Sequence, residues 1–423
     1  LGSGCRTTPA VQATAPAAEA GGVVTLIADG ASDYAIVVPD DDAGGRVAKA
    51  ATLLHDMLKE ATGADLPVVA EAKLPAGRGG IFLGNTRAAA RAGLDIPALR
   101  GWTHRQAVRG RSLFLAGYDA APESAELRGR DYLGTLKATI AFLEQQAGVR
   151  FLLPGPNGVA VPKLARLAVP ADLDVVRTPH LRYCVRWLDQ TYDVANNQFS
   201  PTFYKTYGGH SYYSAVPSAE YAKTHPEYFA LIAGVRDAAQ NHLCISNPEV
   251  QELMLKEMEK QLDKGYEMVQ LAQTDGYVPC ECPQCRALAD EPGERLWIVH
   301  RKLAEQMQAR RPGKKVVILS YGPTTHPPTT FSRLPANVVV ELCNYQQEDF
   351  DQWRPFADDF LVYIYNWGSY QTLGFAPKRT PRFAGEQIRF FLQNKVRGIY
   401  KCGFGENLGL EGPVYYVYGK MIE

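Results

Sequence analysis

The second half of the chain alternates short apolar runs with stretches of helical spacing, and this alternation limits the possible folds more than any other feature. Runs as apolar as Val338-Val339-Val340 fit strands that are buried on both faces, as in a parallel sheet covered by helices. Most of the runs are separated by an expected helix, at 248–264, 294–311 or 382–394. The expected strands are 181–187, 228–232, 268–273, 316–321, 338–345, 360–367 and 397–404.

These intervals are typical of a (β/α)8 barrel of the TIM type, which we expect over 178–423. A full barrel has eight strands, whereas seven are expected here. The stretch 415–422 is expected to be a helix, with no C-cap or further element after it. We therefore expect a barrel truncated at its C-terminal end, with an error in the strand count as the alternative.

The preceding part of the chain, 23–170, is expected to form a small α/β domain. Apolar and β-branched runs at 23–27, 36–38, 66–70, 80–83 and 108–117 predict strands. Two helices are expected between them, at 47–61 and 134–147, and the glycines Gly63 and Gly148 follow in position to end them. Five prolines punctuate 154–179, so we expect a connector there rather than a packed helix.

Residues 1–22 open with Leu1-Gly2-Ser3-Gly4-Cys5 and continue rich in Ala, Pro and Thr. The opening resembles the end of a bacterial lipoprotein signal, in which Cys5 carries the lipid, and the rest is expected to be a flexible tether. An unmodified cysteine in a disordered tail is the alternative. A lipid anchor implies an exported protein, periplasmic or on the cell surface, in a compartment where disulfides persist. No run of about 18 apolar residues predicts a membrane-spanning helix.

The charges of the chain balance, with 45 basic and 45 acidic residues. Such a chain has no overall positive field to attract nucleic acid or an anionic membrane surface, so a lipid at Cys5 is the only membrane contact that we expect. The 22 Tyr and 5 Trp fit a site lined by aromatic rings, although a large core needs such residues too.

In a (β/α) barrel the active site lies at the carboxyl ends of the strands, so the polar and aromatic residues there are the site candidates. They offer carboxylates and aromatic surfaces, and they form neither a Ser-His-Asp order nor a phosphate loop. The candidates are Arg186, Trp187, Asp189, Gln273, Thr274, Asp275, Tyr277, Tyr321, Asn344, Tyr345, Asn366, Trp367, Glu406 and Asn407.

Hydrolysis of a glycosidic bond needs two carboxyl groups, one as acid and one as nucleophile or base. We select Asp275 and Glu406 as this pair, with Glu411 as the reserve catalytic carboxylate. A carboxylate at a strand end can equally cap the next helix, and this alternative stays open for all three. Glu341 lies inside a strand run, so we interpret it as a salt-bridge partner or a polar residue of the barrel interior.

Two histidines are further candidates for sugar binding. His210 lies in a Gly-rich and Tyr-rich loop, 207–213, which is long enough to overhang a barrel mouth. Tyrosine and histidine there can bind sugar rings by stacking and hydrogen bonds. His225 stands before Pro226 at the start of an expected strand and either faces the pocket or has a structural role.

Three cysteines occur within six residues, Cys280, Cys282 and Cys285, just after 275–277. They can supply thiolate ligands to a structural zinc ion, with Cys244 or a histidine as the fourth ligand. A disulfide that pins the loop, together with one free thiol, is the competing interpretation, and an exported location favours it. No other cofactor is expected.

Longer stretches of the sequence resemble known families. The stretch 50–69, with Leu53-Leu54-His55 at its start, and the stretch 134–155 resemble the N-terminal domain of β-hexosaminidases of glycoside hydrolase family 20 and α-glucuronidases of family 67. The segment 179–189 resembles their first barrel strand. The segments 225–232 and 244–250, 273–276 with the three cysteines, 398–400 and 412–416 are similar to the bacterial family called domain of unknown function 4838.

The resemblance implies a glycoside hydrolase of the α-glucuronidase or hexosaminidase type, with a glycosidase-like barrel that acts on polysaccharide outside the cytoplasm. Hexosaminidases carry adjacent Asp and Glu after the fourth strand, where this chain has Asp275-Gly276. A glycan-binding lipoprotein without catalytic activity, built on the same barrel, is the alternative. The residues expected to bind the sugar are Arg186, Trp187, Asp189, His210, His225, Tyr277, Tyr345, Asn366 and Trp367.

Overall fold

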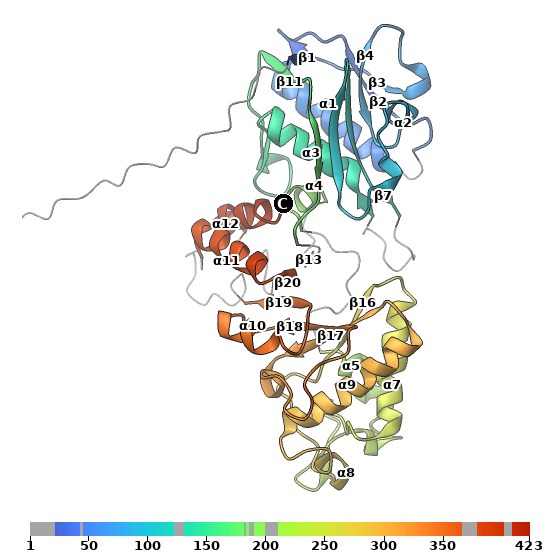
Figure 1. Ribbon diagram of the computed structural model, residues 1–423, viewed down its shortest axis with the longest axis vertical. Helices are drawn as coiled ribbons and strands as arrows, with labels where there is room; N and C mark the ends of the chain where they lie inside the picture. Colours follow the sequence, from blue (N-terminus) through green and yellow to red (C-terminus); the bar gives the residue numbers. More distant parts are fainter. Residues whose placement is uncertain are drawn as a thin grey trace, which may run out of the picture.

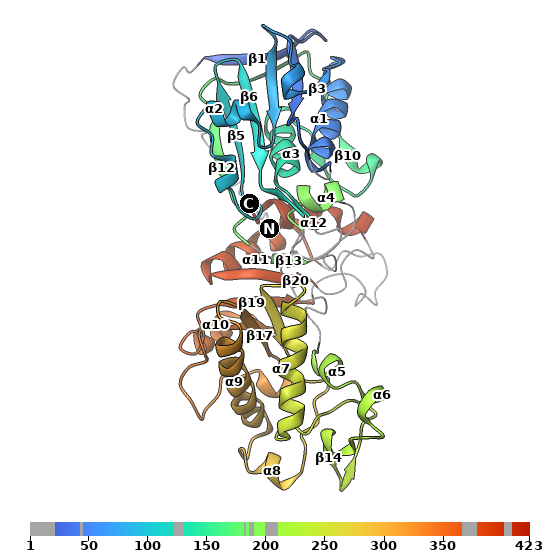
Figure 2. The ribbon, with the colours of Figure 1, turned by 90° about the vertical axis from the view of Figure 1, so that its right-hand side faces the viewer.

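The computed structural model describes residues 22–42, 45–121, 131–181, 183–185, 190–198, 210–365, 379–401 and 408–423. The molecule is elongated, with two sheets along its length (Figure 1). The N-terminal sheet and its helices occupy one end, and a parallel sheet with its helices occupies the other. The C-terminus lies between the two sheets in both views (Figures 1 and 2). Among the described residues, no helix combines the length and the apolar character needed to cross a lipid bilayer.

The N-terminal sheet has six strands in the order β12-β5-β6-β4-β2-β3. Strands β3, β2, β4 and β6 run parallel, whereas β5 is antiparallel to both β6 and β12. The single strand expected over 108–117 is wrong, because the chain turns back at Gly110, where φ is +58°. The strands are β2 (Tyr34–Val38), β3 (Val68–Ala70), β4 (Gly79–Leu83), β5 (His104–Arg109), β6 (Ser112–Gly117) and β12 (Asp174–Arg177).

Two helices, α1 (Arg46–Thr62) and α3 (Gly134–Gln146), pack together with one face of this sheet. Leu54 and Leu58 of α1 point into that layer and are fully buried. The helix ends where predicted, because Gly63 adopts φ of +79° and its N–H donates to the Lys59 carbonyl oxygen. The short helix α2 (Arg87–Arg91) contributes to the smaller core on the opposite face.

The proline-rich segment expected to be a connector returns to the N-terminal part of the molecule. It pairs with the start of the chain, since β11 (Arg166–Pro170) runs antiparallel to β1 (Val23–Ala28), and it then supplies β12 to the edge of the sheet. No helix longer than a single turn forms there, as expected. Shorter strands complete this part: β7 (Asp119–Ala120), β8 (Tyr132–Leu133), β9 (Arg150–Phe151) and β10 (Val159–Ala160).

The second sheet consists of six parallel strands in the order β13-β20-β19-β18-β17-β16. Six of the seven expected strands are thus confirmed, and the first of them lies beside the last. The strands are β13 (Tyr183–Val185), β16 (Met268–Leu271), β17 (Lys315–Ser320), β18 (Val338–Leu342), β19 (Phe360–Ile364) and β20 (Val396–Lys401).

The strand expected over 228–232 is wrong. The chain forms a single 3₁₀ turn, Pro226–Tyr228, and then a hairpin of β14 (Leu231–Ile232) and β15 (Val235–Arg236). Ala233 and Gly234 join the two strands with φ of +47° and +81°. Two successive residues with positive φ are typical of a tight hairpin turn, so the apolar run cannot continue into the parallel sheet.

Helices cover the outer face of the parallel sheet and build the largest core of the molecule with it. The inner face has a small apolar layer of Met268, Val317, Val339 and Leu361, against which Tyr400 packs. The helices of this part are α5 (Tyr212–Ala215), α6 (Ser218–Tyr221), α7 (Pro248–Leu262), α8 (Pro283–Arg286), α9 (Pro292–Arg310), α10 (Gln347–Trp353), α11 (Pro381–Gln393) and α12 (Leu408–Lys420). Helix α4 (Gln190–Ala195) instead packs against α3 and adds Val194 and Ala195 to the N-terminal core.

Helix α12 links the two parts of the molecule. Lys420 pairs with Glu144 of α3 at 2.7 Å, and Glu423 accepts a hydrogen bond of 2.6 Å from the buried Lys137. The same carboxylate lies 3.1 Å from His104 of β5. Burial raises the pKa of Glu423, but the Lys137 ammonium and the contact with His104 outweigh it, so this pKa lies well below the usual range.

Candidate functional site

The carboxyl ends of the parallel strands meet at one edge of the sheet, and the segment that begins at His210 joins β16 at this edge. The Ala272 N–H donates to Ser211 Oγ at 2.9 Å, and the Tyr212 N–H donates to the Ala272 carbonyl oxygen at 3.3 Å. Tyr212 is anchored to α9 through a hydrogen bond of 2.8 Å to His300 Nε2. Burial lowers the pKa of His300 to about 3, so its imidazole is neutral and can accept the tyrosine proton.

This anchoring brings His210, Asp275 and Tyr321 together. His210 Nε2 lies 3.6 Å from Asp275 Oδ1, and the Tyr321 hydroxyl donates to the same oxygen at 3.3 Å. His210 Nδ1 donates to the carbonyl oxygen of Gln273, because a carbonyl only accepts. The imidazole therefore holds one proton on Nδ1 and turns Nε2 toward the carboxylate. The Asp275 side chain is 61% exposed, so a ligand can reach it.

The loop that carries Asp275 is fixed on both sides. Gln273 Nε2 donates to the Tyr321 carbonyl oxygen at 3.0 Å and to Thr324 Oγ1 at 2.9 Å, which ties the loops after β16 and β17 together. Thr274 Oγ1 donates to the Asn241 carbonyl oxygen at 2.7 Å. Gln273, Thr274 and Thr324 are buried, so these contacts hold the backbone that leads into the exposed carboxylate.

The tyrosines of this region are protonated at neutral pH. Burial and the negative charge of Asp275 raise the pKa of Tyr321, so its hydroxyl remains a donor to the carboxylate. Burial likewise raises the pKa of Tyr277, whose ring lies in the interior, edge-on to His242 at 6.3 Å. Within the described part of the chain the Tyr277 hydroxyl has no hydrogen-bond partner.

Aromatic rings line the same edge of the sheet beyond Asp275. Tyr363 of β19 packs against Tyr365 at 4.6 Å between centroids and against Tyr400 of β20 at 4.8 Å. Tyr365 is 38% exposed, which leaves part of its surface open to a ligand. Tyr345, which follows β18, is half-buried and packs edge-on against Phe391 of α11.

Glu341 lies one layer below this edge, on the inner face of the sheet. It is fully buried in β18 and accepts a hydrogen bond of 2.9 Å from Gln270 of β16. The sequence-based interpretation of Glu341 as a polar residue of the interior is confirmed. The inward positions of Gln270, Tyr363 and Tyr400 were not singled out from the sequence, although each alternates with an outward apolar residue at the period of two that strands require.

The remaining candidates occupy different surroundings. His225 stacks on Tyr228 at 4.5 Å between ring centroids, and its Nδ1 lies 3.0 Å from Glu227. It is also close to Glu249 of α7, with a ring nitrogen and a carboxylate oxygen within 4.8 Å of each other. Glu411 lies in the first turn of α12, where it is buried and accepts a hydrogen bond of 2.5 Å from Tyr415. Seven candidates lie outside the described residues: Arg186, Trp187, Asp189, Asn366, Trp367, Glu406 and Asn407.

The cysteines of the 280–285 motif come together with Cys244, one of the fourth ligands expected from the sequence. The four Sγ atoms lie within 4.8 Å of one another, and none of these cysteines forms a disulfide. Cys244 precedes α7, whereas the other three lie in the loop after β16 or in α8. The same loop carries Asp275, so the cluster and the candidate site share one segment of chain.

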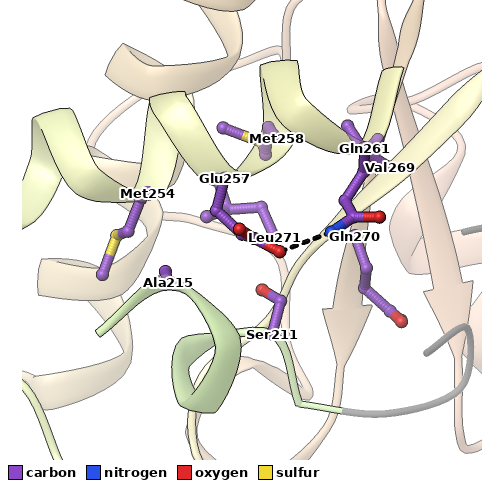
Figure 3. Close-up of a pocket in the computed structure, with 9 residues that line it drawn as sticks. All are labelled: Ser211, Ala215, Met254, Glu257, Met258, Gln261, Val269, Gln270 and Leu271. Atoms are coloured by element: carbon purple, nitrogen blue, oxygen red, sulfur yellow. Dashed lines mark hydrogen bonds between the residues drawn. The ribbon is translucent and has the colours of Figure 1, made fainter. Parts of the chain in front are cut away.

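A hollow beside β16, the last strand of the sheet among the described residues, is lined by α7, α5 and the strand itself (Figure 3). Gln261 donates a hydrogen bond of 2.6 Å to Glu257 on its polar side, while Met254 and Met258 form part of its apolar wall. Its cavity volume of about 10 Å³ holds roughly one water molecule. The hollow is therefore too small for a sugar, and its lining does not include Asp275.

Solved structures with a similar fold include enzymes that act on carbohydrates. A β-N-acetylhexosaminidase from Bacteroides fragilis aligns over 95% of this chain and 88% of its own, with a TM-score of 0.50 and 12% identity. An exo β-N-acetylglucosaminidase of family GH20 from Vibrio harveyi, in complex with N-acetylglucosamine, aligns over 95% of this chain and 71% of its own. Its TM-score is 0.45 and its identity is 11%. The protein CpGH84B aligns over 95% of this chain and 69% of its own, with a TM-score of 0.43 and 11% identity.

At 12% identity the first of these likenesses concerns the fold alone, and it is the fold of a glycoside hydrolase. No curated protein matches the chain. The family model described as domain of unknown function (DUF4838) matches residues 153–422. This range contains the whole parallel sheet, the group of His210, Asp275 and Tyr321, and the four clustered cysteines. The chain therefore belongs to the DUF4838 family.

Proposed function

We propose that the chain is a glycoside hydrolase whose parallel sheet is part of a (β/α)8 barrel, with the active site at the carboxyl edge of the strands. The first strand of the sheet, β13, lies parallel to the last, β20, and this pairing is the one that closes a barrel. The likeness of the fold to the Bacteroides fragilis β-N-acetylhexosaminidase supports the same architecture. Barrel enzymes carry their active sites at this edge, where Asp275 lies.

The group of His210, Asp275 and Tyr321 carries the proposal. A glycosidase needs a carboxyl group that can hold and release a proton beside the leaving-group oxygen. Asp275 is exposed, and two groups face the same carboxylate oxygen, an imidazole nitrogen and a phenol. The phenol stabilises the carboxylate as it ionises, and the imidazole is placed to exchange a proton with it. We assign Asp275 as the proton-transferring carboxylate of the reaction.

A second carboxylate completes the reaction. We assign this role to Glu406, which follows β20, the neighbour of β19 in the sheet. Glu411, a few residues further on, is the reserve. In an inverting enzyme the two carboxyl groups stand about 6.5–9.5 Å apart and leave room for water, whereas in a retaining enzyme they stand about 5 Å apart. Gly276 follows Asp275, so the proposed mechanism uses a carboxylate from another strand rather than an adjacent Asp-Glu pair.

The substrate that we propose is a polysaccharide bearing uronic acid or N-acetylhexosamine units. Sugar rings stack on accessible aromatic faces, which the exposed Tyr365 and the half-buried Tyr345 offer. Further sugar contacts are assigned to His210 and to residues after β13 and β19, with the Arg186 guanidinium suited to a uronic carboxylate. The location that we infer is outside the cytoplasm, with the chain held at a membrane through a lipid on Cys5. The residues after these two strands are Arg186, Trp187, Asp189, Asn366 and Trp367.

The test is hydrolysis of a glycan panel by the whole chain, with plant, algal and host polysaccharides and with aryl α-glucuronides and N-acetyl-β-hexosaminides. Asp275→Asn and Glu406→Gln are compared with Asp290→Asn, which alters an exposed carboxylate in the loop that carries Asp275. We expect product release by the wild type and by Asp290→Asn, and loss of release in the other two. Binding of a glycan without cleavage by the wild type would instead support the glycan-binding lipoprotein.

A further inference from the structure

Four cysteine side chains meet in the interior. One of them, Cys285, belongs to α8, which lies at the end of the molecule far from the N-terminal sheet (Figures 1 and 2). Cys244, Cys280, Cys282 and Cys285 are at most 4% exposed. The cluster is separate from the group of His210, Asp275 and Tyr321, and its function can be tested without any knowledge of the substrate.

The spacing of the sulfur atoms fits a single tetrahedral metal ion. Cys244 Sγ lies 3.6 Å from Cys282 Sγ and 3.9 Å from Cys285 Sγ. In a tetrahedral zinc site with zinc–sulfur bonds of about 2.3 Å, neighbouring sulfur atoms are about 3.8 Å apart. In a disulfide the two sulfur atoms are about 2.05 Å apart, so the observed separations match shared coordination rather than covalent pairing.

The compactness of the cluster also separates it from an iron–sulfur site. Cysteine ligands of an iron–sulfur cluster surround two or more iron atoms with bridging sulfides, so the thiolates are spread around a larger centre. Here all four Sγ atoms lie within 4.8 Å of one another, which leaves room for one ion. Four thiolates in a tetrahedron are the ligand set that zinc takes in closed structural sites.

The surroundings of the sulfur atoms suit thiolates. The Leu231 N–H donates to Cys280 Sγ at 3.3 Å, and the Cys285 N–H donates to Cys282 Sγ at 3.4 Å. The Arg236 guanidinium lies 3.7 Å from Cys280 Sγ. Zinc with four thiolates carries a net charge of −2, and N–H donors and a nearby cation offset that charge in a buried site.

We infer that Cys244, Cys280, Cys282 and Cys285 bind one zinc ion in a closed structural site. The ligands come from two segments of the chain that are separated in the sequence by α7 and β16, so the ion fastens these segments together. Cys244 precedes α7, the 280–285 motif belongs to the loop after β16, and the hairpin is joined to that loop where the Glu281 N–H donates to the Leu231 carbonyl oxygen at 2.8 Å. With all four positions filled by protein, the ion has no site for a substrate and supports the fold of the loop that carries Asp275.

The experiment is metal analysis of the whole chain, purified with a thiol reductant and without chelator from zinc-supplemented cells. We expect one zinc ion per chain in the wild type and in Cys343→Ser, whose cysteine lies outside the cluster. Cys244→Ser and Cys285→Ser should each bind at least about fivefold less zinc per chain than the wild type, since a structural site needs its full ligand set.

A second measurement covers the case in which these variants fail to fold. In the wild type, a mercurial reagent that modifies thiols should release the zinc in step with the modification of four cysteines. Cobalt exchanged into the site should show the intense visible bands of tetrahedral thiolate coordination. Wild-type chain that lacks zinc and binds neither zinc nor cobalt overturns the inference. So does intact-mass evidence that these cysteines form disulfides in the folded protein.

Discussion

Glu294 of α9 is the side chain whose replacement tests the packing around the candidate site most sharply. It is 8% exposed, and its carboxylate accepts four hydrogen bonds from the loop between β17 and β18. The Thr329 N–H and hydroxyl reach Oε2 at 2.8 and 3.0 Å, and the Thr330 N–H reaches Oε1 at 3.0 Å, beside the hydroxyl of the same residue. This loop begins at Tyr321, which contacts Asp275.

Glu294→Gln places an amide NH₂ where one carboxylate oxygen now accepts two donors. One backbone N–H then loses its acceptor, and the two remaining hydrogen bonds lose the help of the negative charge. A buried hydrogen bond to a charged group contributes about 1.5–3 kcal/mol, and an unsatisfied buried donor costs about 1–3 kcal/mol. Because the threonine hydroxyls can rotate to other partners, we expect a loss of about 3 kcal/mol in the free energy of unfolding at pH 7.

The assay is urea denaturation followed by tryptophan fluorescence, with Glu305→Gln as the control on the exposed side of the same helix. The control loses only an exposed ion pair with Arg301, worth about 0.3–0.5 kcal/mol. Burial raises the pKa of Glu294, but the four hydrogen bonds outweigh it and hold the pKa below 4.5. The stabilisation is therefore present above pH 4.5 and is lost as the pH falls through the folded-state pKa. A loss no larger than that of the control refutes the reasoning.

Three further changes have defined outcomes. Asp174→Asn should lower the free energy of unfolding by about 1 kcal/mol at pH 7 and by only a small part of that at pH 2, because the arginines of β5 lower the pKa of Asp174 to about 2 and solvent screens this partly exposed group; denaturation at both pH values measures the difference. Gly134→Ala should lower the free energy of unfolding by about 3 kcal/mol, since the new Cβ would lie 2.2 Å from the backbone nitrogen of Tyr118. A melting temperature within about one degree of the wild-type value contradicts this. Tyr321→Phe should reduce turnover by about tenfold with unchanged stability, because it removes one donor to Asp275; equal turnover rejects the role of that hydroxyl.

Most strands of the parallel sheet were predictable because burial on both faces makes them largely apolar, as in β17 and β18. The same rule fails at 228–232, where the run is also apolar but Ala233 and Gly234 turn the chain into a hairpin. It fails again at Gly110, where a positive φ divides one expected strand into β5 and β6. In each case a local turn overrides hydrophobic pattern, and a single glycine in the sequence is too weak a signal to reveal it.

The candidate site was predictable only in part. Asp275 follows from its place after an apolar strand, since strand ends meet at one edge of a parallel sheet. Its contact with His210 does not follow, because it depends on Ser211 pairing with Ala272, some 60 residues away in the chain. Cys244 was expected only as one of two alternatives for the fourth ligand, because its approach to the 280–285 motif depends on the path of the chain through α7 and β16.

The central claim is that Asp275 transfers a proton in glycosidic hydrolysis, and paired measurements on Asp275→Asn test it most directly. The substrate is the glycan that the wild type cleaves, with kcat taken from product release and Kd from calorimetry under the same conditions. We expect kcat to fall by about 10²–10⁴-fold, which is the usual contribution of a general acid or base to the rate. Kd should stay within about threefold of the wild-type value. A kcat that stays within about threefold of the wild type contradicts the account, because general acid–base catalysis lost at the reacting bond cannot leave turnover intact.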